Sequence, residues 1–472
     1  MTEEPPASAE KSPPRYVLLA AALAAGVLTI FLLHTQSAWP REAVFMAGIF
    51  VLAATLWATE ALPLFATALL VIALEIVLLA NPGGWPGLGF AGGSAPDYRQ
   101  IVHAAADPIL LLFFGGFLLA QAAAKEGVDR AVSSLLLAPF EKHAKTLLLG
   151  VLGVTATFSM WMSNTATAAM MIALVAPIVA QLPPGEPFRK ALTLAVCVGA
   201  NLGGLGTPIA SPPNAVAVGF LRQAGYPVGF LDWMLVGVPL MALLILCAWL
   251  LLWRLFPPRT AALRLELVRH RLSGRAIYVV GVFVTTVLLW LSEHWHGLPA
   301  PVVALLPAIA LTAPGILSRD DLHRLPWNIL ILIGGGIALG AGMQMTGLDR
   351  LLVQQLPAGS GGPWLLASLV LATVIISTFM SNTAAANLLL PIGISTAGSG
   401  SPVLAAVSIA LAASVSMALP ISTPPNAIAY ASGEISTRDL ARVGIVLGLV
   451  SMILIVILGG PMMRIFGMLD AS

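Results

Sequence analysis

The stretch that decides the fold is SMWMSNTATAAMM, residues 159–171, which contains a short polar motif, or word, within an apolar run. That word, Ser163-Asn164-Thr165-Ala166, returns in the second half as Ser381-Asn382-Thr383-Ala384. Each copy is followed by a second word, Ser211-Pro212-Pro213-Asn214 or Thr423-Pro424-Pro425-Asn426. The Asn residues of the two words are 50 positions apart in the first half and 44 in the second. The recurrence of both words at similar spacing indicates an internal repeat.

The composition is that of an integral membrane protein. Hydrophobic residues make up 58% of the 472 residues and charged residues 9%, against about 25% charged in a typical soluble domain. The formal net charge of +2 gives no reason to expect a nucleic-acid partner. The two cysteines, Cys197 and Cys247, have no partner spacing, so we interpret them as small core residues without a disulfide or zinc role.

Apolar runs long enough to cross a bilayer, about 20 residues, can be placed along the whole chain. We therefore expect an all-α membrane protein with about eleven transmembrane helices and two re-entrant hairpins. A disordered cytoplasmic tail at 1–15 and a first helix at 16–33 precede a first repeat at 43–256, which contains a hairpin at 146–182 and a broken helix at 190–222. An Arg-rich cytoplasmic linker at 257–275 leads to a second repeat at 276–466, which contains a hairpin at 364–398 and a broken helix at 402–432.

The distribution of basic residues predicts the topology. With the N-terminus in the cytoplasm and the C-terminus outside, 18 of the 23 Lys and Arg residues fall on the cytoplasmic side, as the positive-inside rule requires. The residues left outside are Arg41, Arg99, Arg222, Arg350 and Arg464. The cluster between the halves is the expected linker, with a lipid-headgroup or nucleic-acid patch as the alternative; its members are Arg254, Arg259, Arg264, Arg269, Arg271 and Arg275. Five crossings plus a hairpin in each half would invert the second repeat relative to the first.

The residues around the repeated words indicate what they bind. Irregular backbone at bilayer depth is tolerated where it lines a cavity, so the four words predict one composite site near the midplane. No Lys, Arg or His occurs in the four segments that carry them, 146–182, 199–221, 363–401 and 402–434. A bound anion would therefore be held by hydroxyls, amides and helix N-termini, and exposed carbonyl oxygens would hold Na⁺. The alternative is that these Ser, Thr and Pro residues only bond to their own helices or kink them.

On these motifs the chain resembles the divalent anion/sodium symporters, the family of sodium-coupled di- and tricarboxylate transporters that also includes sulfate carriers. The resemblance covers about residues 43 to 466. Besides the segment at 159–171 it rests on LWATEALPLFATALL at 56–70, LFFGGFLLAQA at 112–122, GLGTPIASPPNA at 204–215 and ALPISTPPNAIAYASG at 418–433. The chain departs from the family pattern where Ala210-Ser211 replaces the more usual Gly-Thr before Pro-Pro.

The resemblance implies a homodimer that moves substrate by an elevator mechanism, with two or more Na⁺ as coupling ions. It implies sodium ligands at Ser159, Ser163, Asn164, Gly206 and Ala210 in the first repeat and at Ser377, Ser381, Asn382, Ala418 and Ser422 in the second. It implies substrate contacts from Ser163, Asn164, Thr165, Ser211, Ser381, Asn382, Thr383, Thr423 and Pro424. The leading expectation is a plasma-membrane symporter of C4-dicarboxylates such as succinate, malate or fumarate. A sodium-independent exchanger, or a citrate or sulfate carrier, is the alternative.

Several other residues allow both a structural and a functional interpretation. Glu60 is expected to cap the next helix, with a proton relay as the alternative, and Glu75 to approach the interface or to form a pair, with a coupling role as the alternative. His294 and His296 are expected in a solvated loop without metal, and the glycines 334–336 in close helix packing. An enzyme is not expected, because the site segments offer no His, Asp or Glu to activate a hydroxyl. A channel is not expected, because the inverted repeat is typical of transporters.

Overall fold

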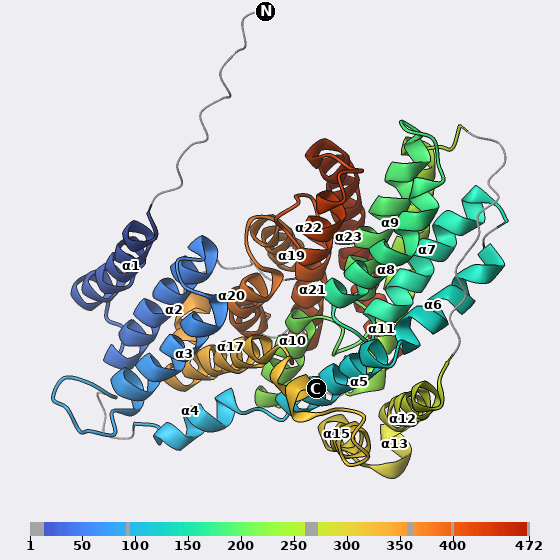
Figure 1. The fold of residues 1–472 in the computed structure, drawn as a ribbon. Helices are drawn as coiled ribbons and strands as arrows, with labels where there is room; N and C mark the ends of the chain where they lie inside the picture. Colours follow the sequence, from blue (N-terminus) through green and yellow to red (C-terminus); the bar gives the residue numbers. More distant parts are fainter. Residues whose placement is uncertain are drawn as a thin grey trace, which may run out of the picture.

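The computed structural model describes residues 14–90, 95–140, 142–259, 272–355, 362–397 and 401–469. Within these ranges the regular secondary structure is entirely helical, as expected (Figure 1). The expected tail is described only at its end, where α1 already begins at Arg15. Three arginines of the expected linker, Arg264, Arg269 and Arg271, lie outside the described residues.

One group of helices precedes or separates the hairpin segments, and we call it the outer group. Its first half is α1 (Arg15–Gln36), α2 (Arg41–Thr59), α3 (Leu64–Glu75), the π-helical turn η1 (Ile76–Ala80), α4 (Tyr98–Ala105), α5 (Ile109–Lys125), α6 (Val128–Leu137) and the 3₁₀ turn η2 (Ala138–Phe140). Its second half is α12 (Gly274–Leu291), α13 (Glu293–His296), α14 (Ala300–Val303), α15 (Leu305–Thr312), α16 (Arg319–His323), α17 (Trp327–Thr346) and α18 (Leu348–Gln354).

The second group, the inner group, contains the repeated words, and its element order is the same in both halves. The first half contributes α7 (Ala144–Ser159), α8 (Asn164–Ala180), α9 (Pro187–Gly203), α10 (Pro212–Gln223) and α11 (Phe230–Leu255). The second half contributes α19 (Pro363–Phe379), α20 (Asn382–Thr396), α21 (Pro402–Ser414), α22 (Pro424–Ala431) and α23 (Thr437–Ile465). The helix breaks thus fall at the four words, within the hairpins and broken helices that the sequence predicts.

The local sequence explains where these helices begin. Ser163 is extended, at φ −62° and ψ 141°, and its hydroxyl accepts a hydrogen bond from the Ala166 amide, so α8 starts with a capped N-terminus. Ser211 and Thr423 are extended at φ −145° and −144°. The proline that follows each of them is the first helical residue, where its missing N–H costs nothing. Each word therefore marks the start of a helix that follows a break in the chain.

The two halves are interlocked in the inner group. The hairpin helix α8 packs against α22 of the other half, and α20 packs against α10. In Figure 1, α10, α20 and α21 lie in the middle of the molecule. On the outer side, α17 packs on α3, α10 and α20. Each half-helix therefore completes the surroundings of a hairpin that belongs to the other half.

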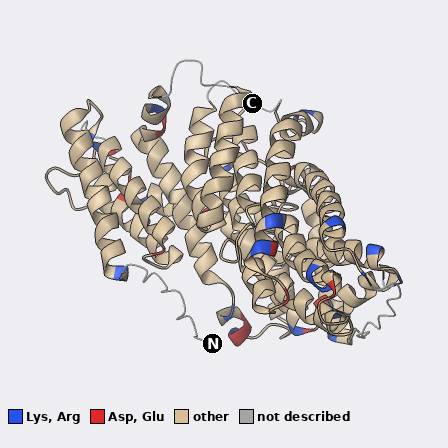
Figure 2. Ribbon diagram, turned by 90° about the horizontal axis from the view of Figure 1, so that it is seen from above, with Lys and Arg blue, Asp and Glu red and all other residues tan. Residues whose placement is uncertain are grey.

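Seven helices within the described residues are long and apolar enough to span a membrane, and six further apolar helices are shorter. Charged residues are sparse along them, as the tan ribbon of Figure 2 shows. Length alone does not reproduce the expected eleven crossings, because several expected crossings are interrupted. The apolar segment 299–314 is interrupted at Ala304, between α14 and α15, and the apolar segment 62–80 changes to a π-helical turn after Glu75. The helices α4 and α6 were not expected.

Candidate functional site

The tip of the first hairpin contains a cluster of three oxygen atoms. The Ser159 hydroxyl lies 2.7 Å from Asn164 Oδ1 and 2.7 Å from the carbonyl oxygen of Ala200 in α9. Its single proton can be donated to only one of these acceptors at a time. Ser159 is fully buried. The cluster therefore offers more oxygen lone pairs than protons, which is the composition of a hard-cation site.

The second hairpin repeats this geometry. Ser377 Oγ lies 2.8 Å from Asn382 Oδ1 and 3.0 Å from the carbonyl oxygen of Ala413 in α21. Ser377 is also fully buried. Two equivalent oxygen clusters, one in each half, are thus built by the same Ser and Asn spacing.

The Asn residues of the Pro-Pro-Asn words brace the unwound loops. Asn214 Nδ2 donates to the carbonyls of Gly204 and Thr207, at 2.8 Å each. Asn426 Nδ2 donates to the carbonyls of Met417 and Leu419, at 2.8 and 2.9 Å. Both Asn side chains are completely buried. Their amides therefore satisfy carbonyls that the broken helices leave without partners.

Further hydrogen bonds attach each loop to its hairpin and to the other half. Thr207 Oγ1 donates to the Met160 carbonyl at 2.6 Å, and Ser422 Oγ donates to the Thr378 carbonyl at 2.8 Å. Between the halves, Asn201 Nδ2 donates to Asn426 Oδ1 at 3.0 Å, and the hydroxyls of Ser211 and Ser414 lie 3.1 Å apart. The two unwound loops and the two hairpin tips thus form one connected polar network.

A cavity of about 710 Å³ opens beside this network. All nine residues expected to contact substrate line it: Ser163, Asn164, Thr165, Ser211, Ser381, Asn382, Thr383, Thr423 and Pro424. The structure therefore brings together side chains that lie up to 261 positions apart, from Ser163 to Pro424. Their roles in binding stay predictions.

The expected sodium ligands are divided between the cavity and the network behind it. Ala210 and Ser422 line the cavity, as do the hairpin residues shared with the substrate set. Four others do not line it: Ser159, Gly206, Ser377 and Ala418. All four lie on the inner helices or unwound loops behind the tips. A Cβ added to Gly204 would lie 2.8 Å from Asn164 Nδ2, so this glycine lets the loop approach the tip closely.

The opposite wall of the cavity comes from the outer group, and most of its residues are not predicted as cavity residues by the sequence. It includes Phe113 and Phe117 of α5, Asn328 and Leu332 of α17, and Glu60 at the end of α2. These residues carry no repeated word that would mark them. Two family motifs touch this wall, LFFGGFLLAQA at 112–122, which contains Phe113 and Phe117, and LWATEALPLFATALL at 56–70, which contains Glu60, but neither predicted a place in the cavity.

The expected cap at Glu60 is wrong. The N-cap of α3 is Pro63, and no side chain accepts a hydrogen bond there. Glu60 instead ends α2 in the left-handed region, at φ 48°, and it faces the cavity.

The ion pair that was one expectation for Glu75 is not found among the described residues. Glu75 is 0% exposed, and neither carboxyl oxygen has a hydrogen-bond partner among the described residues. A Cβ on Gly342 would lie 2.5 Å from its Oε1, so α17 covers it closely. The coupling role remains a prediction.

The glycine run packs as expected, whereas His294 and His296 lie in the short helix α13 and not in a loop. Added Cβ atoms on Gly334, Gly335 and Gly336 would lie 2.0 to 2.4 Å from neighbouring atoms, which confirms close helix packing. His296 bonds locally, to the carbonyl of Leu289 and the amide of Leu298. Within the described residues no group of His, Cys, Asp and Glu could hold a metal, and both cysteines are free.

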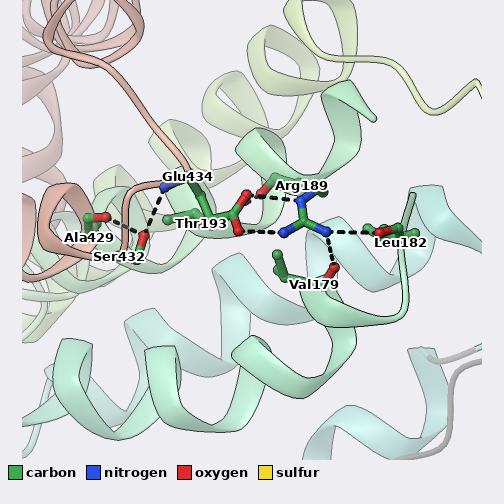
Figure 3. A network of polar contacts seen from close by, with 7 residues as sticks. All are labelled: Val179, Leu182, Arg189, Thr193, Ala429, Ser432 and Glu434. Atoms are coloured by element: carbon green, nitrogen blue, oxygen red, sulfur yellow. Dashed lines mark hydrogen bonds and ion pairs between the residues drawn. The ribbon is translucent and has the colours of Figure 1, made fainter. Parts of the chain in front are cut away.

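A second polar network joins the halves far from the oxygen clusters (Figure 3). The Arg189 guanidinium, at the start of α9, forms a bidentate pair with Glu434, at 2.9 and 2.5 Å. Its third nitrogen donates to the carbonyl of Val179, in the last turn of α8, at 2.9 Å, and to that of Leu182, just after α8, at 2.8 Å. Lys190 pairs with Asp439 of α23 at 2.8 Å. Because Glu434 follows α22, this network ties the ends of α8 and α22 together.

The family model described as the sodium:sulfate symporter transmembrane region matches residues 15–469. The chain belongs to this symporter family. This confirms the resemblance noted from the motifs, and it places the chain among membrane transporters, not enzymes.

Curated relatives of this family member match over most of their length. An uncharacterized transporter of Haemophilus influenzae is 32% identical over 446 residues, which covers 89% of this chain and 92% of the relative. The sodium-dependent dicarboxylate transporter SdcS of Staphylococcus aureus is 31% identical over 478 residues, which covers 91% of this chain and 88% of the relative.

Two solved structures show a similar fold. MtrF of Neisseria gonorrhoeae has a TM-score of 0.57 at 14% identity, covering 86% of this chain and 96% of MtrF. The YdaH transporter of Alcanivorax borkumensis has a TM-score of 0.53 at 15% identity, covering 84% of this chain and 97% of YdaH. At these identities the likeness concerns the fold alone.

Proposed function

We propose that this symporter-family protein couples the entry of C4-dicarboxylates such as succinate, malate or fumarate to Na⁺. The observation that carries the proposal is the pair of equivalent oxygen clusters, at Ser159–Asn164 and Ser377–Asn382, beside one cavity. A relative at 31% identity is named a sodium-dependent dicarboxylate transporter, which supports the choice of ion and substrate class.

The anion would be held without any basic side chain. The lining of the cavity offers hydroxyls from Ser163, Thr165, Ser381 and Thr383 and amides from Asn164 and Asn382. The N-termini of α8 and α20, which begin at these Asn residues, direct the positive ends of their dipoles to the same place. A volume of about 710 Å³ falls in the usual range for small-molecule sites, about 300–1,000 Å³.

The two Asn residues would link the ion to the substrate. Each Asn places Oδ1 in an oxygen cluster and also lines the cavity. A Na⁺ held at Oδ1 would fix the side chain and leave its NH₂ group free to donate to a carboxylate. Because the cation also offsets the charge of the dianion, each ligand would bind more tightly in the presence of the other.

Transport would proceed by an elevator motion of the inner group against the outer group, in a plasma-membrane homodimer with a cytoplasmic N-terminus. The motion is supported by the arrangement of the boundary, where α10 and α20 lie on the glycine-rich α17. The inverted relation of the repeats belongs to the same proposal, because it would give each oxygen cluster an equivalent environment on opposite sides of the membrane.

The deciding experiment is uptake of labelled succinate into proteoliposomes that contain the purified protein. An inward Na⁺ gradient is compared with K⁺ or choline at equal osmolarity. We expect uptake that requires Na⁺ and rises more steeply than first order with its concentration. Uptake without Na⁺ that is stimulated by internal succinate would replace the symporter with an exchanger.

Sulfate is the second candidate substrate, because the matching family model is named for sodium:sulfate symport. Hydroxyls, amides and helix N-termini bind sulfate by the same contacts as a carboxylate. Competition between unlabelled sulfate and labelled succinate, in the same vesicles, decides between them. Citrate is tested in the same series.

A further inference from the structure

Glu60 is the one charged residue among the described residues that line the cavity. Every other lining residue is apolar or carries only a neutral polar group. Its side chain is exposed. A negative charge in a cavity that would bind anions needs an explanation, because it repels the substrate.

The conformation of Glu60 offers no structural reason for a glutamate. It is one of only two non-glycine residues in the described chain with a positive φ, 48°, where Gly or Asn is the ordinary choice. It does not cap α3, and no hydrogen bond or ion pair of its carboxylate is found among the described residues. Arg15 lies behind the same turn, but its Nε donates to the carbonyl of Ala61 at 2.7 Å. Strain without a local gain is typical of a functional position.

The charges on the two sides of the cavity are opposed. The inner wall contains the N-termini of α8 and α20, which are partially positive. The outer wall contains Glu60. This arrangement favours anions at the inner wall and cations near the outer wall. It also penalises an anion more strongly as its charge grows.

We propose that Glu60 selects substrate by charge, disfavouring anions with three negative charges relative to dianions and drawing Na⁺ into the cavity. This inference rests on the proposed function, and it names a selecting residue on the outer group. At a charge separation of about 10 Å, one unit of charge changes affinity by roughly two- to fifteen-fold at effective dielectric constants of about 80 to 20.

The test compares wild type with Glu60→Gln in the proteoliposome assay at pH 8, where citrate is a trianion. The measured quantity is the inhibition constant of citrate divided by the KM of succinate. We expect this ratio to fall by roughly two- to fifteen-fold in Glu60→Gln and the Na⁺ concentration for half-maximal uptake to rise. Tighter binding of citrate together with weaker binding of Na⁺ identifies an electrostatic effect. A change in the shape of the cavity would not shift the two affinities in opposite directions according to the charge of the ion.

Two further variants make the result decisive. Glu60→Asp keeps the charge and should keep the ratio of wild type, whereas Glu60→Asn removes the charge and suits the left-handed backbone, so it covers the case in which Glu60→Gln fails to fold. Glu293→Gln is the matched control, because Glu293 in α13 does not line the cavity. An unchanged ratio in both neutral variants, or Glu60→Asp behaving like Glu60→Gln, would overturn the proposal.

A failure of the proposed function is recognised separately. If wild type shows no Na⁺-dependent succinate uptake, the proposed function fails. The dissociation constant of citrate divided by that of succinate is then measured by thermal-shift titrations of the purified protein. That ratio needs binding but no transport. A lower ratio in Glu60→Gln supports the inference, and an equal ratio, or no binding of either anion, overturns it.

Discussion

The unwound loops of the two halves match in sequence and differ in surroundings. Ile209 and Ile421 each lie two positions before the residue that precedes Pro-Pro. Ile209 is 8% exposed and rests on α5, where a Cβ on Gly116 would lie 3.2 Å from its Cδ1. Ile421 is 79% exposed, although both residues line the cavity. One loop is therefore seated on the outer group while the other is not, and under the proposed elevator motion such an asymmetry would characterise one end of the cycle.

The same contrast appears ten positions after the first proline of each Pro-Pro-Asn word. There the first half has Arg222 and the second has Glu434. Arg222 pairs with Asp107, between α4 and α5 of the outer group, at 3.2 Å. Glu434 pairs with Arg189 of the inner group. These equivalent positions carry opposite charges. The pair of Arg222 connects the first half to the outer group, whereas the pair of Glu434 stays within the inner group.

The largest effect is expected at the hairpin tips, where the halves are alike. Asn164→Ala and Asn382→Ala should each lower succinate uptake by about 100-fold or more, because each change removes an oxygen ligand and an amide donor together. Size-exclusion chromatography should show both variants folded. Asn387→Ala is a matched control, since Asn387 lies on α20 outside the cavity lining. Normal transport by either tip variant would show that the halves do not contribute equally.

A disulfide between the seated loop and the outer group should stop transport. The Cβ of Ile209 lies 3.7 Å from a Cβ built on Gly116, which is within the disulfide range of about 3.5–4.5 Å. Gly116→Cys with Ile209→Cys, in a background without Cys197 and Cys247, should lose most uptake on oxidation and recover it on reduction. Fully cross-linked protein that transports at the reduced rate would contradict motion at this boundary.

Chemical labelling measures the asymmetry of the loops directly. In the same cysteine-free background, a polar maleimide should label Ile421→Cys at least about ten times faster than Ile209→Cys, since reaction requires an accessible thiolate. Denatured samples of both variants, labelled at equal rates, are the control. Equal rates in the folded proteins would remove the distinction between the two loops.

The charged pairs should differ in what they control. Arg222→Gln leaves Asp107, which is 5% exposed, with only the Ile109 amide as partner, and should cost about 1–3 kcal/mol of the free energy of unfolding. It should also raise the labelling rate of Ile209→Cys, because the pair attaches α10 to the outer group. Glu434→Gln should cost stability without changing that rate. An equal effect of both variants on labelling would contradict the distinction between the pairs.

The smallest effect concerns a pair that lies wholly within the outer group. Lys125, 2.5 Å from Asp321, holds the pKa of that carboxyl well below its usual range. The pair stabilises the native state above the ordinary Asp pKa of about 4, and this contribution is lost as pH falls through the depressed value. Because Lys125 is 35% exposed, Asp321→Asn should cost only about 1 kcal/mol at pH 7. Thermal unfolding in detergent should show a smaller difference at pH 3, and no difference at pH 7 would contradict this assignment.

The sequence predicted the inner group better than the outer group, for a physical reason. Polar words and Pro pairs within apolar runs mark places where helices must break, so both hairpins and the residues that face the cavity were found from local signals. The outer wall has no such signal, because Phe113, Asn328 and Glu60 reach the cavity only through tertiary packing. The bracing roles of Asn214 and Asn426 likewise depend on carbonyls made available by unwinding.

The crossed packing of the hairpins affects the order of events during synthesis. Arg189 and Glu434 are 245 residues apart, and α8 packs against α22. At a synthesis rate of about 5–20 residues per second, the first hairpin waits roughly 12–50 seconds for its partner. During that interval its polar tip lies in the bilayer or at the insertion machinery without the half-helix that completes its environment. The first hairpin is therefore exposed to quality control throughout this interval.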